Sequence, residues 1–262
     1  MSINKSYIKK ILKKRPLVCL TANNIYMAKI LDDICDIILT GDSLGMVVYG
    51  YKTTRKVSLD MMINHAKAVG KGIKKSIFVV DMPKGTYEKS PKTAFKNAKK
   101  IKKMSGCDAV KIEGGAKISR IIKTLVKKNI SVMAHIGLQP QKITSSKKYK
   151  VVGKSQNEIK KIINDLKAVE KAGAFSVVLE SVTENLANII CKISKIPVIG
   201  IGASNKCDGQ ILVTEDLLGL FDKTPKFVKK YENLRAKIRG AVKQYCIEVS
   251  NRKFPGKKNI YI

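Results

Sequence analysis

The sequence has no tryptophan and only two histidines among its 262 residues. A zinc centre built mainly from histidines is therefore excluded, because such a centre needs several of them at one place. The six cysteines lie far apart, without a C-x-x-C pair and without a histidine at metal-ligand spacing. We therefore expect six reduced thiols rather than a disulfide framework or a structural metal site.

Long hydrophobic runs are also missing. No apolar run approaches the roughly 18 to 20 residues that a membrane-spanning helix needs. The start of the chain, MSINKSYIKKILKKRP, has no long hydrophobic region and no small-residue cleavage site. An organelle presequence is an alternative for this basic amphipathic stretch, but the usual arginine and serine enrichment is absent. We expect a cytoplasmic protein, with no membrane association, that begins with a short helix.

Acidic residues are scarce, since 20 Asp and Glu stand against 52 Lys and Arg, for a formal net charge of +32. A nucleic-acid-binding protein is the obvious alternative for such a charge. The lysines, however, are spread along nearly every expected helix and are not clustered with aromatic residues for base stacking. We interpret the excess as a sequence-wide drift in residue usage and expect no specific nucleic-acid partner. A steep salt dependence of tight DNA binding would favour the alternative.

The sequence does contain short β-branched runs that alternate with longer helical patterns, which is typical of repeated βα units. The eight runs are 16–21, 36–40, 76–81, 108–113, 130–135, 175–180, 197–202 and, less clearly, 210–214. Gly106, Asn129 and Gly173 stand where a helix needs a left-handed terminator before the next strand. The pattern predicts an α/β protein, a single (βα)8 TIM barrel domain over residues 1–262; a doubly wound open sheet is the alternative.

Polar residues recur where these runs end. They are Thr21, Asp42, Ser43, Asp81, Lys111, Glu113, His135 and Glu180. In a (βα)8 barrel the carboxyl ends of the strands form the floor of the active site. One strand-end acid would more often be a helix cap. Four carboxylates in successive positions, in a chain with only 20 acidic residues among 262, indicate a shared site.

Carboxylates packed this closely repel each other, so the site requires a cation. Oxygen ligands without cysteine suit Mg²⁺, which takes one or two protein carboxylates and fills its remaining positions with water and substrate oxygens. Bound Mg²⁺ would polarise a substrate carbonyl, and a carboxylate away from the metal would take a proton. Glu180 is our candidate for that base.

Several motifs resemble those of the ketopantoate hydroxymethyltransferase (3-methyl-2-oxobutanoate hydroxymethyltransferase) family over essentially the whole chain. They are GDSLGM (41–46), DMP (81–83), KIEGG (111–115), HIGLQPQ (135–141), YKVVG (149–153), VIGIGA (198–203), CDGQILV (207–213) and PKFVKKY (225–231). The order and separation of GDSLGM and KIEGG make this resemblance specific.

The resemblance implies a Mg²⁺-dependent barrel enzyme of pantothenate synthesis. Such an enzyme transfers a hydroxymethyl group from 5,10-methylenetetrahydrofolate, its co-substrate, to 3-methyl-2-oxobutanoate and gives 2-dehydropantoate. Family resemblance also implies a homo-oligomer, a decamer, that acts on small molecules.

Carried over by motif, Asp42 and Asp81 would hold Mg²⁺ and the chelated substrate, with Glu113 in or near the metal shell. Ser43 and Lys111 would contact the substrate. In the same comparison, Glu180 would remove the C3 proton. His135 would hold the substrate or a neighbouring carboxylate by a hydrogen bond, with a purely structural role as its alternative, and we expect His65 to be structural.

The chain departs from the family pattern in places. Asn23 and Asn24 stand where a Tyr-Asp pair is usual, and Lys147 and Lys148 stand where we expect glycines. Lys84 stands where an aromatic residue is common, and Ser204 stands where a glycine is usual. Activity is still expected, although the lid-like segment 145–154 and the folate contacts could differ.

Two enzymatic alternatives remain open at this point. A Mg²⁺-dependent lyase or mutase of the phosphoenolpyruvate-type barrel superfamily would use similar carboxylates but no folate. A Schiff-base aldolase with Lys111 as nucleophile is less favoured, because Glu113 and a metal would keep that lysine charged.

Overall fold

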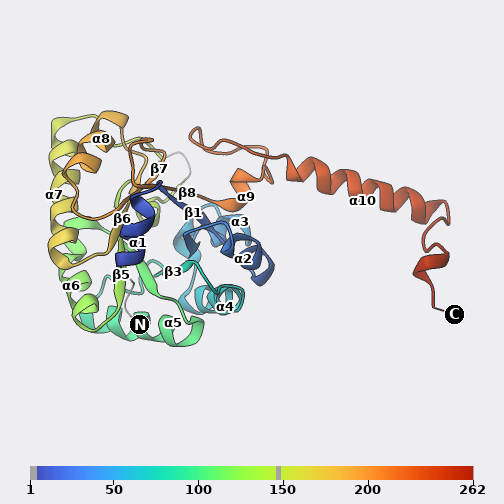
Figure 1. The fold of residues 1–262 in the computed structure, drawn as a ribbon, viewed down its shortest axis with the longest axis horizontal. Coiled ribbons are helices and arrows are strands. Elements are labelled where there is room, and N and C mark those ends of the chain that lie inside the picture. Colours follow the sequence, from blue (N-terminus) through green and yellow to red (C-terminus); the bar gives the residue numbers. More distant parts are fainter. Residues whose placement is uncertain (1–4, 146–148, 262) are drawn as a thin grey trace. The chain divides into compact units, whose positions relative to one another are not determined.

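In the computed structural model, which describes residues 5–145 and 149–261, eight parallel strands close into a barrel (Figure 1). The strands are β1 (Leu17–Thr21), β2 (Ile37–Thr40), β3 (Ile77–Asp81), β4 (Ala109–Glu113), β5 (Ser131–Gly137), β6 (Ser176–Glu180), β7 (Val198–Ile201) and β8 (Gly209–Leu212). Each pairs with the next in sequence, and β8 closes on β1. The predicted TIM barrel is thereby confirmed, and the open sheet is excluded.

Most helices lie around the outside of the barrel, whereas the N-terminal helix adds Ile8 to the core inside it (Figure 1). Those of the barrel region are α1 (Lys5–Leu12), α2 (Ile25–Asp32), α3 (Leu44–Val47), α4 (Leu59–Gly70), α5 (Pro91–Ser105), α6 (Ser119–Lys127), α7 (Gln156–Ala172) and α8 (Glu184–Ile193), with short 3-10 helices η1 (Thr54–Lys56), η2 (Gly115–Ile118) and η3 (Pro140–Lys142). The short helix expected before the first strand is α1. Gly106, Asn129 and Gly173 adopt φ of 75°, 59° and 96°, as predicted for left-handed terminators.

Strands β2 to β6 read as nearly unbroken apolar runs because both of their faces are buried, whereas β1 and β8 expose Val18 and Gln210. In β3, Ile77 and Val79 belong to the core inside the barrel, whereas Phe78 and Val80 pack in the larger core between the sheet and the helices. All five residues of this strand are buried. A side chain at the inner end of such a strand therefore points into the barrel mouth, which is how Asp81 comes to face the site.

The connection between β7 and β8 differs from the expected βα unit. Residues 202–208 run directly from one strand to the next, and this fully described stretch contains no helix. Parallel strands are usually joined by a dozen or more residues. The short return is held by Asp208, whose side chain accepts a hydrogen bond from the Val198 N–H at 2.8 Å and whose carbonyl accepts one from the Leu17 N–H at 2.7 Å.

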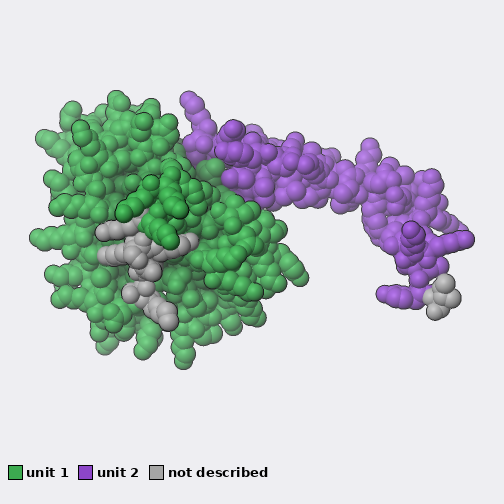
Figure 2. Space-filling model, in the orientation of Figure 1, with its two compact units in different colours: residues 1–212 green, residues 213–262 purple. Residues whose placement is uncertain are grey.

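The chain divides into two compact units, Met1–Leu212 and Val213–Ile262 (Figure 2). The first contains the whole barrel. The second contains α9 (Thr214–Leu217), α10 (Leu234–Ser250) and η5 (Lys257–Asn259), and α10 buries none of its residues. The sequence pattern does not separate this segment, and the expectation of one domain over 1–262 stays a prediction.

Two sequence expectations concern the whole chain. Within residues 5–145 and 149–261, no helix has the length and apolar character to span a membrane. All six cysteines are free thiols, including Cys191 and Cys207, whose sulfur atoms lie 3.5 Å apart.

Asp32 ends α2 and is predicted to stabilise the fold. Its buried carboxylate accepts hydrogen bonds from the backbone N–H groups of Lys74, Lys75 and Ser76 at 2.9 to 3.2 Å. Burial acts to raise the pKa of Asp32, but these hydrogen bonds lower it below its ordinary value. We expect Asp32→Asn to lower the free energy of unfolding by about 1–3 kcal/mol, because an amide offers one oxygen where the carboxylate offers two.

The matched control is Asp33→Asn, since the Asp33 side chain is exposed and only pairs with Lys75. Urea unfolding measures both variants. Because the folded-state pKa of Asp32 is depressed, its contribution is present above the unfolded pKa of about 3.9 and is lost as the pH falls through the folded value. The difference in free energy of unfolding between wild type and Asp32→Asn should therefore become smaller at acidic pH. Equal effects of the two substitutions near neutral pH would contradict this role.

Candidate active site

The register of the strands sets which predicted residues meet. Asp81, the last residue of β3, is aligned with Lys111 of β4. Glu113, the last residue of β4, is aligned with His135 of β5. Neighbouring strand positions on one face of a sheet place side chains close together. The barrel therefore gathers these residues at one rim, as the sequence predicts, although β5 runs two residues past His135.

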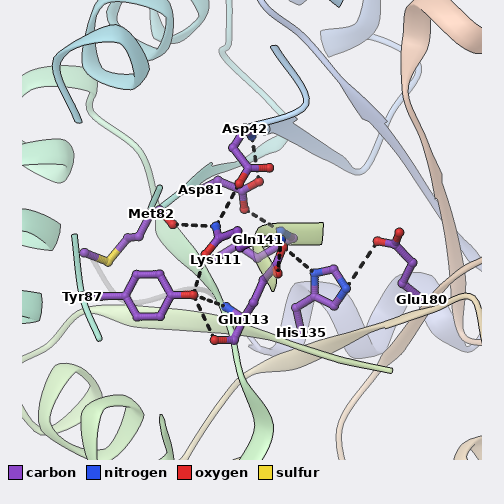
Figure 3. Close-up of polar contacts among 9 residues, drawn as sticks. All are labelled: Asp42, Asp81, Met82, Tyr87, Lys111, Glu113, His135, Gln141 and Glu180. Carbon is purple, nitrogen blue, oxygen red and sulfur yellow. Dashed lines mark hydrogen bonds and ion pairs between the residues drawn. The ribbon is translucent and has the colours of Figure 1, made fainter. Parts of the chain in front are cut away.

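Asp81 and Lys111 form a buried ion pair (Figure 3). The Lys111 Nζ lies 2.6 Å from Asp81 Oδ1, and their side chains are 7% and 3% exposed. Burial acts to lower the pKa of the Lys111 ammonium, but Asp81 and the other site carboxylates outweigh it and raise that pKa. Lys111 is thus a fixed positive charge, which disfavours the Schiff-base alternative because a nucleophilic amine must be neutral.

Asp42 follows β2 by two residues and is buried. Its backbone N–H donates to Asp81 Oδ2 at 3.0 Å, and its own carboxylate accepts a hydrogen bond from Gln141 Nε2 at 2.9 Å. Burial, followed by the charge of Asp81, raises the pKa of Asp42 to about 7. The charges of Asp42 and Asp81 repel each other and Lys111 offsets part of that repulsion, so a further cation would be stabilised here.

His135 lies between two glutamates (Figure 3). Its Nδ1 is 3.5 Å from Glu113 Oε1, and its Nε2 is 3.3 Å from Glu180 Oε2. Burial, with Lys111 adding to it, lowers the pKa of His135 well below its ordinary value, so the ring is neutral. A neutral imidazole has a single N–H. His135 can therefore donate to one glutamate at a time, and these contacts are not charged pairs.

The two glutamates differ in access to the barrel mouth. The Glu180 side chain is 12% exposed, whereas that of Glu113 is 3% exposed. Burial raises the pKa of Glu180 to about 8, with Lys111 opposing the shift and Asp42 adding to it. Burial also raises the pKa of Glu113, with Asp42 adding to that shift. A base must reach its substrate. Glu180 is therefore the better placed of the two.

Ser43 precedes α3 and stands next to the carboxylates. A Cβ atom at Gly41 would lie 3.1 Å from Ser43 Oγ and 3.4 Å from Asp81 Oδ2. The absence of a side chain at Gly41 therefore leaves space between the serine hydroxyl and the aspartate. The predicted contact of Ser43 with a substrate stays a prediction.

Sequence reasoning missed two residues, Gln141 and Tyr87. Gln141 contacts both Asp42 and Glu113, and the Tyr87 hydroxyl contacts Gln141 and the backbone of Glu113. Neither side chain titrates near neutral pH, and Tyr87 lies in a loop with no periodic pattern. The only available signal was the HIGLQPQ motif, which ends at Gln141.

The remaining sequence candidates lie away from these carboxylates. His65 of α4 contacts the Tyr49 hydroxyl at 3.0 Å and the Asn23 carbonyl at 2.7 Å. Asn24 caps α2 by accepting a hydrogen bond from the Met27 N–H at 2.9 Å, which gives this departure from the family pattern a local structural role. Lys147 and Lys148, within the lid-like segment 145–154, lie outside the described residues.

The donor set at the rim suits Mg²⁺. In the part of the chain that the structure describes, no three His, Cys, Asp or Glu side chains form a metal-binding group. Mg²⁺ does not need one, because it usually binds one or two protein carboxylates and completes its octahedron with water and substrate oxygens. Asp42 and Asp81 fit that requirement. One oxygen of Glu113 accepts the Gln141 backbone N–H at 3.1 Å, and the other lies 3.5 Å from His135 Nδ1.

Solved structures show the same fold in distant proteins. A phosphoenolpyruvate phosphomutase from Streptomyces platensis subsp. rosaceus is 11% identical and has a TM-score of 0.62 over 95% of this chain and 88% of its own. A phosphonopyruvate hydrolase solved with oxalate and Mg²⁺ is 12% identical and has a TM-score of 0.60, over 98% and 93%. At these identities the likeness concerns fold alone, so the lyase or mutase alternative gains no support beyond the barrel.

Sequence comparison is much more specific. The 3-methyl-2-oxobutanoate hydroxymethyltransferase of Rhizobium etli is 51% identical over 92% of this chain and 89% of its own length. The enzyme of the same name from Pelagibacter ubique is 49% identical over 98% of each chain. The family model for ketopantoate hydroxymethyltransferase matches residues 3–257. The chain therefore belongs to the ketopantoate hydroxymethyltransferase family of enzymes.

Proposed function

We propose that this enzyme transfers a hydroxymethyl group from 5,10-methylenetetrahydrofolate to 3-methyl-2-oxobutanoate and gives 2-dehydropantoate, in pantothenate and coenzyme A synthesis. The names of its close relatives support the acceptor and the type of transfer. The observation that carries the proposal is the placement of a buried aspartate pair and the more accessible Glu180 at one barrel rim.

Asp42 and Asp81 would hold Mg²⁺, and Glu113 would lie in or beside its shell. Bound there, the metal supplies a Lewis acid that draws electrons from the keto oxygen of the substrate. Lys111 keeps its positive charge beside Asp81 and favours the anionic 2-oxo acid. Ser43, which lies near Asp81 on the other side of Gly41, would contact the same substrate.

Glu180 would act as the general base. The C3–H bond of 3-methyl-2-oxobutanoate breaks, its proton goes to a Glu180 carboxylate oxygen, and C3 forms the new carbon–carbon bond to the one-carbon unit of the folate. The two C–N bonds that hold the one-carbon unit to the folate break, and water supplies the hydroxyl oxygen. Tetrahydrofolate leaves after its two nitrogens have received one proton from Glu180 and one from that water. Neutral His135 stands between Glu113 and Glu180, with its ring nitrogens 3.5 Å and 3.3 Å from their oxygens, and its single N–H would hold Glu180 in place.

Purified protein assayed with 3-methyl-2-oxobutanoate, methylenetetrahydrofolate and Mg²⁺ tests the proposal directly. Each component is omitted in turn, and 2-dehydropantoate is measured. The product should form only when all three are present. Consumption of a 2-oxo acid without folate would instead favour a lyase or mutase activity.

The second unit supports the proposal that the protein is a homo-oligomer. Four apolar side chains of α10 recur at helical spacing and are 43% to 54% exposed; they are Ile238, Val242, Tyr245 and Val249. On the barrel unit, α2 exposes Tyr26 and Ile30, and Ile34, two residues after the end of this helix, is also exposed. Exposed apolar stripes of this kind mark protein–protein contacts. A decamer is the assembly that family resemblance favours.

Sedimentation velocity measures this assembly. Val242→Glu is expected to shift the protein to smaller species, because a charge in the apolar stripe would have to be buried on association. Lys243→Glu is the matched control, since it places the same residue at the neighbouring exposed position outside the stripe. Identical sedimentation of wild type and Val242→Glu would show that α10 is not part of the interface.

The cytoplasmic location stays a prediction, and six free thiols suit a reducing compartment.

A further inference from the structure

One buried glutamine connects three parts of the site (Figure 3). The Gln141 side-chain Nε2 donates to Asp42 Oδ2 at 2.9 Å and to the Met82 carbonyl at 3.0 Å. Its Oε1 accepts from the Tyr87 hydroxyl at 2.7 Å, and its backbone N–H donates to Glu113 Oε2 at 3.1 Å. Every side-chain polar atom of Gln141 is thus used, and its residue is only 2% exposed.

The surroundings fix the orientation of the Gln141 amide. Nε2 faces two oxygen acceptors, the Asp42 carboxylate and the Met82 carbonyl. Turning the amide over would place Oε1 against both of them, with no proton between the oxygens. The two acceptors therefore set the orientation in which Gln141 donates to Asp42. The Tyr87 hydroxyl supports it by donating its one proton to Gln141 Oε1 at 2.7 Å, in competition with the Glu113 carbonyl at 2.9 Å.

Gln141 contacts Asp42 and Glu113, two site residues that are distant from it in sequence. It lies in η3, after β5, and is 99 residues from Asp42 in sequence. Through its side chain and its backbone it holds one oxygen of Asp42 and one oxygen of Glu113. Each of these carboxyl groups therefore has one oxygen anchored by Gln141, which sets the direction of its other oxygen.

We propose that Gln141, supported in its orientation by Tyr87, is a positioning residue that aims Asp42 and Glu113 for Mg²⁺ binding. The inference rests on the proposed function, because it takes Asp42 as a ligand and Glu113 as its neighbour. The competing explanation is that Gln141 is only a satisfied buried polar group that supports the barrel rim. The two explanations differ in what happens to metal affinity in folded protein.

Gln141→Met is the main variant, because methionine has a similar length and no donor. Calorimetry of Mg²⁺ binding to protein without folate or substrate gives the readout, and urea unfolding confirms that the titrated protein is folded. We expect Mg²⁺ affinity to fall about 10- to 100-fold, the usual effect of removing a residue that orients a metal ligand. Gln139→Met is the matched control, since Gln139 is also buried, two residues earlier, and its Oε1 has no hydrogen-bond partner among the described residues. Its Mg²⁺ affinity should equal that of wild type.

Tyr87→Phe tests the path of the effect. Loss of the hydroxyl removes a donor to Gln141 Oε1 and also two hydrogen bonds with the Glu113 backbone, so Mg²⁺ affinity should fall. In the Gln141→Met background the same substitution should cause a smaller loss, because the part of the effect that passes through Gln141 is already gone. Fully additive losses would overturn the path through Gln141. If Gln141→Met does not fold, Tyr87→Phe becomes the test of the inference. Unchanged Mg²⁺ affinity in Tyr87→Phe would then overturn it.

Two outcomes separate this inference from the proposed function. Folded Gln141→Met that binds Mg²⁺ as tightly as wild type would show a structural glutamine and leave the proposed reaction standing. Wild-type protein that binds no Mg²⁺, alone or with 3-methyl-2-oxobutanoate, would overturn both.

Discussion

Glu180→Gln is expected to bind Mg²⁺ and 3-methyl-2-oxobutanoate but to lose exchange of the substrate C3 hydrogen by about 10²- to 10⁴-fold, the usual effect of removing a general base. The amide keeps the shape of the side chain and its place beside His135, but it cannot take a proton at neutral pH. Asp42 and Asp81, the proposed metal ligands, are unchanged in this variant. Binding and proton removal should therefore separate.

Proton NMR in D₂O without folate measures this exchange apart from carbon–carbon bond formation. Glu184→Gln is the matched control, because Glu184 lies four residues later on the exposed first turn of α8. The control should exchange at the wild-type rate. Wild-type exchange by Glu180→Gln would assign the base elsewhere, and loss of Mg²⁺ binding would make Glu180 a ligand.

The exchange rate should also rise with pH, since only the ionised form of Glu180 accepts a proton. Burial raises the pKa of this carboxyl to about 8. The rate is therefore low below the pKa and reaches a plateau above it. Bound Mg²⁺ should move the rise to lower pH, because a nearby cation favours the carboxylate. A pH profile of the exchange checks this, and the rise should be absent from Glu180→Gln.

Asp81→Asn is expected to weaken Mg²⁺-dependent binding of the 2-oxo acid by more than about 100-fold, beyond the loss typical of residues that only orient a ligand. The substitution removes a charged ligand and also leaves the buried Lys111 ammonium without its partner at 2.6 Å. Calorimetry with and without Mg²⁺ measures the effect. Asp60→Asn is the control, because the Asp60 side chain is 79% exposed on α4 and pairs only with Lys100.

Stability has to be separated from binding in this case. Removing one partner of a buried ion pair typically costs about 3–5 kcal/mol of folding free energy. The double variant Asp81→Asn with Lys111→Met removes the unpaired charge and should recover much of that loss in urea unfolding. Mg²⁺-dependent binding should stay lost in the double variant. Unchanged Mg²⁺-dependent affinity in folded Asp81→Asn would exclude Asp81 as a metal ligand.

The sequence alone was sufficient to predict the barrel and to indicate where its candidate site would lie. Each strand lies within two residues of its predicted run, because a parallel strand buried on both faces must be apolar along its whole length. The ends of those runs also pointed to Asp81 and Glu180, since polar residues interrupt the apolar runs where the strands reach the barrel mouth. Gly106 and Gly173 marked helix ends for an equally local reason, namely a left-handed backbone that glycine adopts without strain.

Only the tertiary structure decided how these residues meet. The register between β3 and β4 pairs Lys111 with Asp81, and burial at the closed rim makes His135 neutral. The contact between Gln141 and Asp42 joins positions 99 residues apart, and no local pattern encodes it. Periodicity and strand ends depend on neighbours along the chain. Contacts, burial and protonation depend on neighbours in space, which exist only after the barrel has closed.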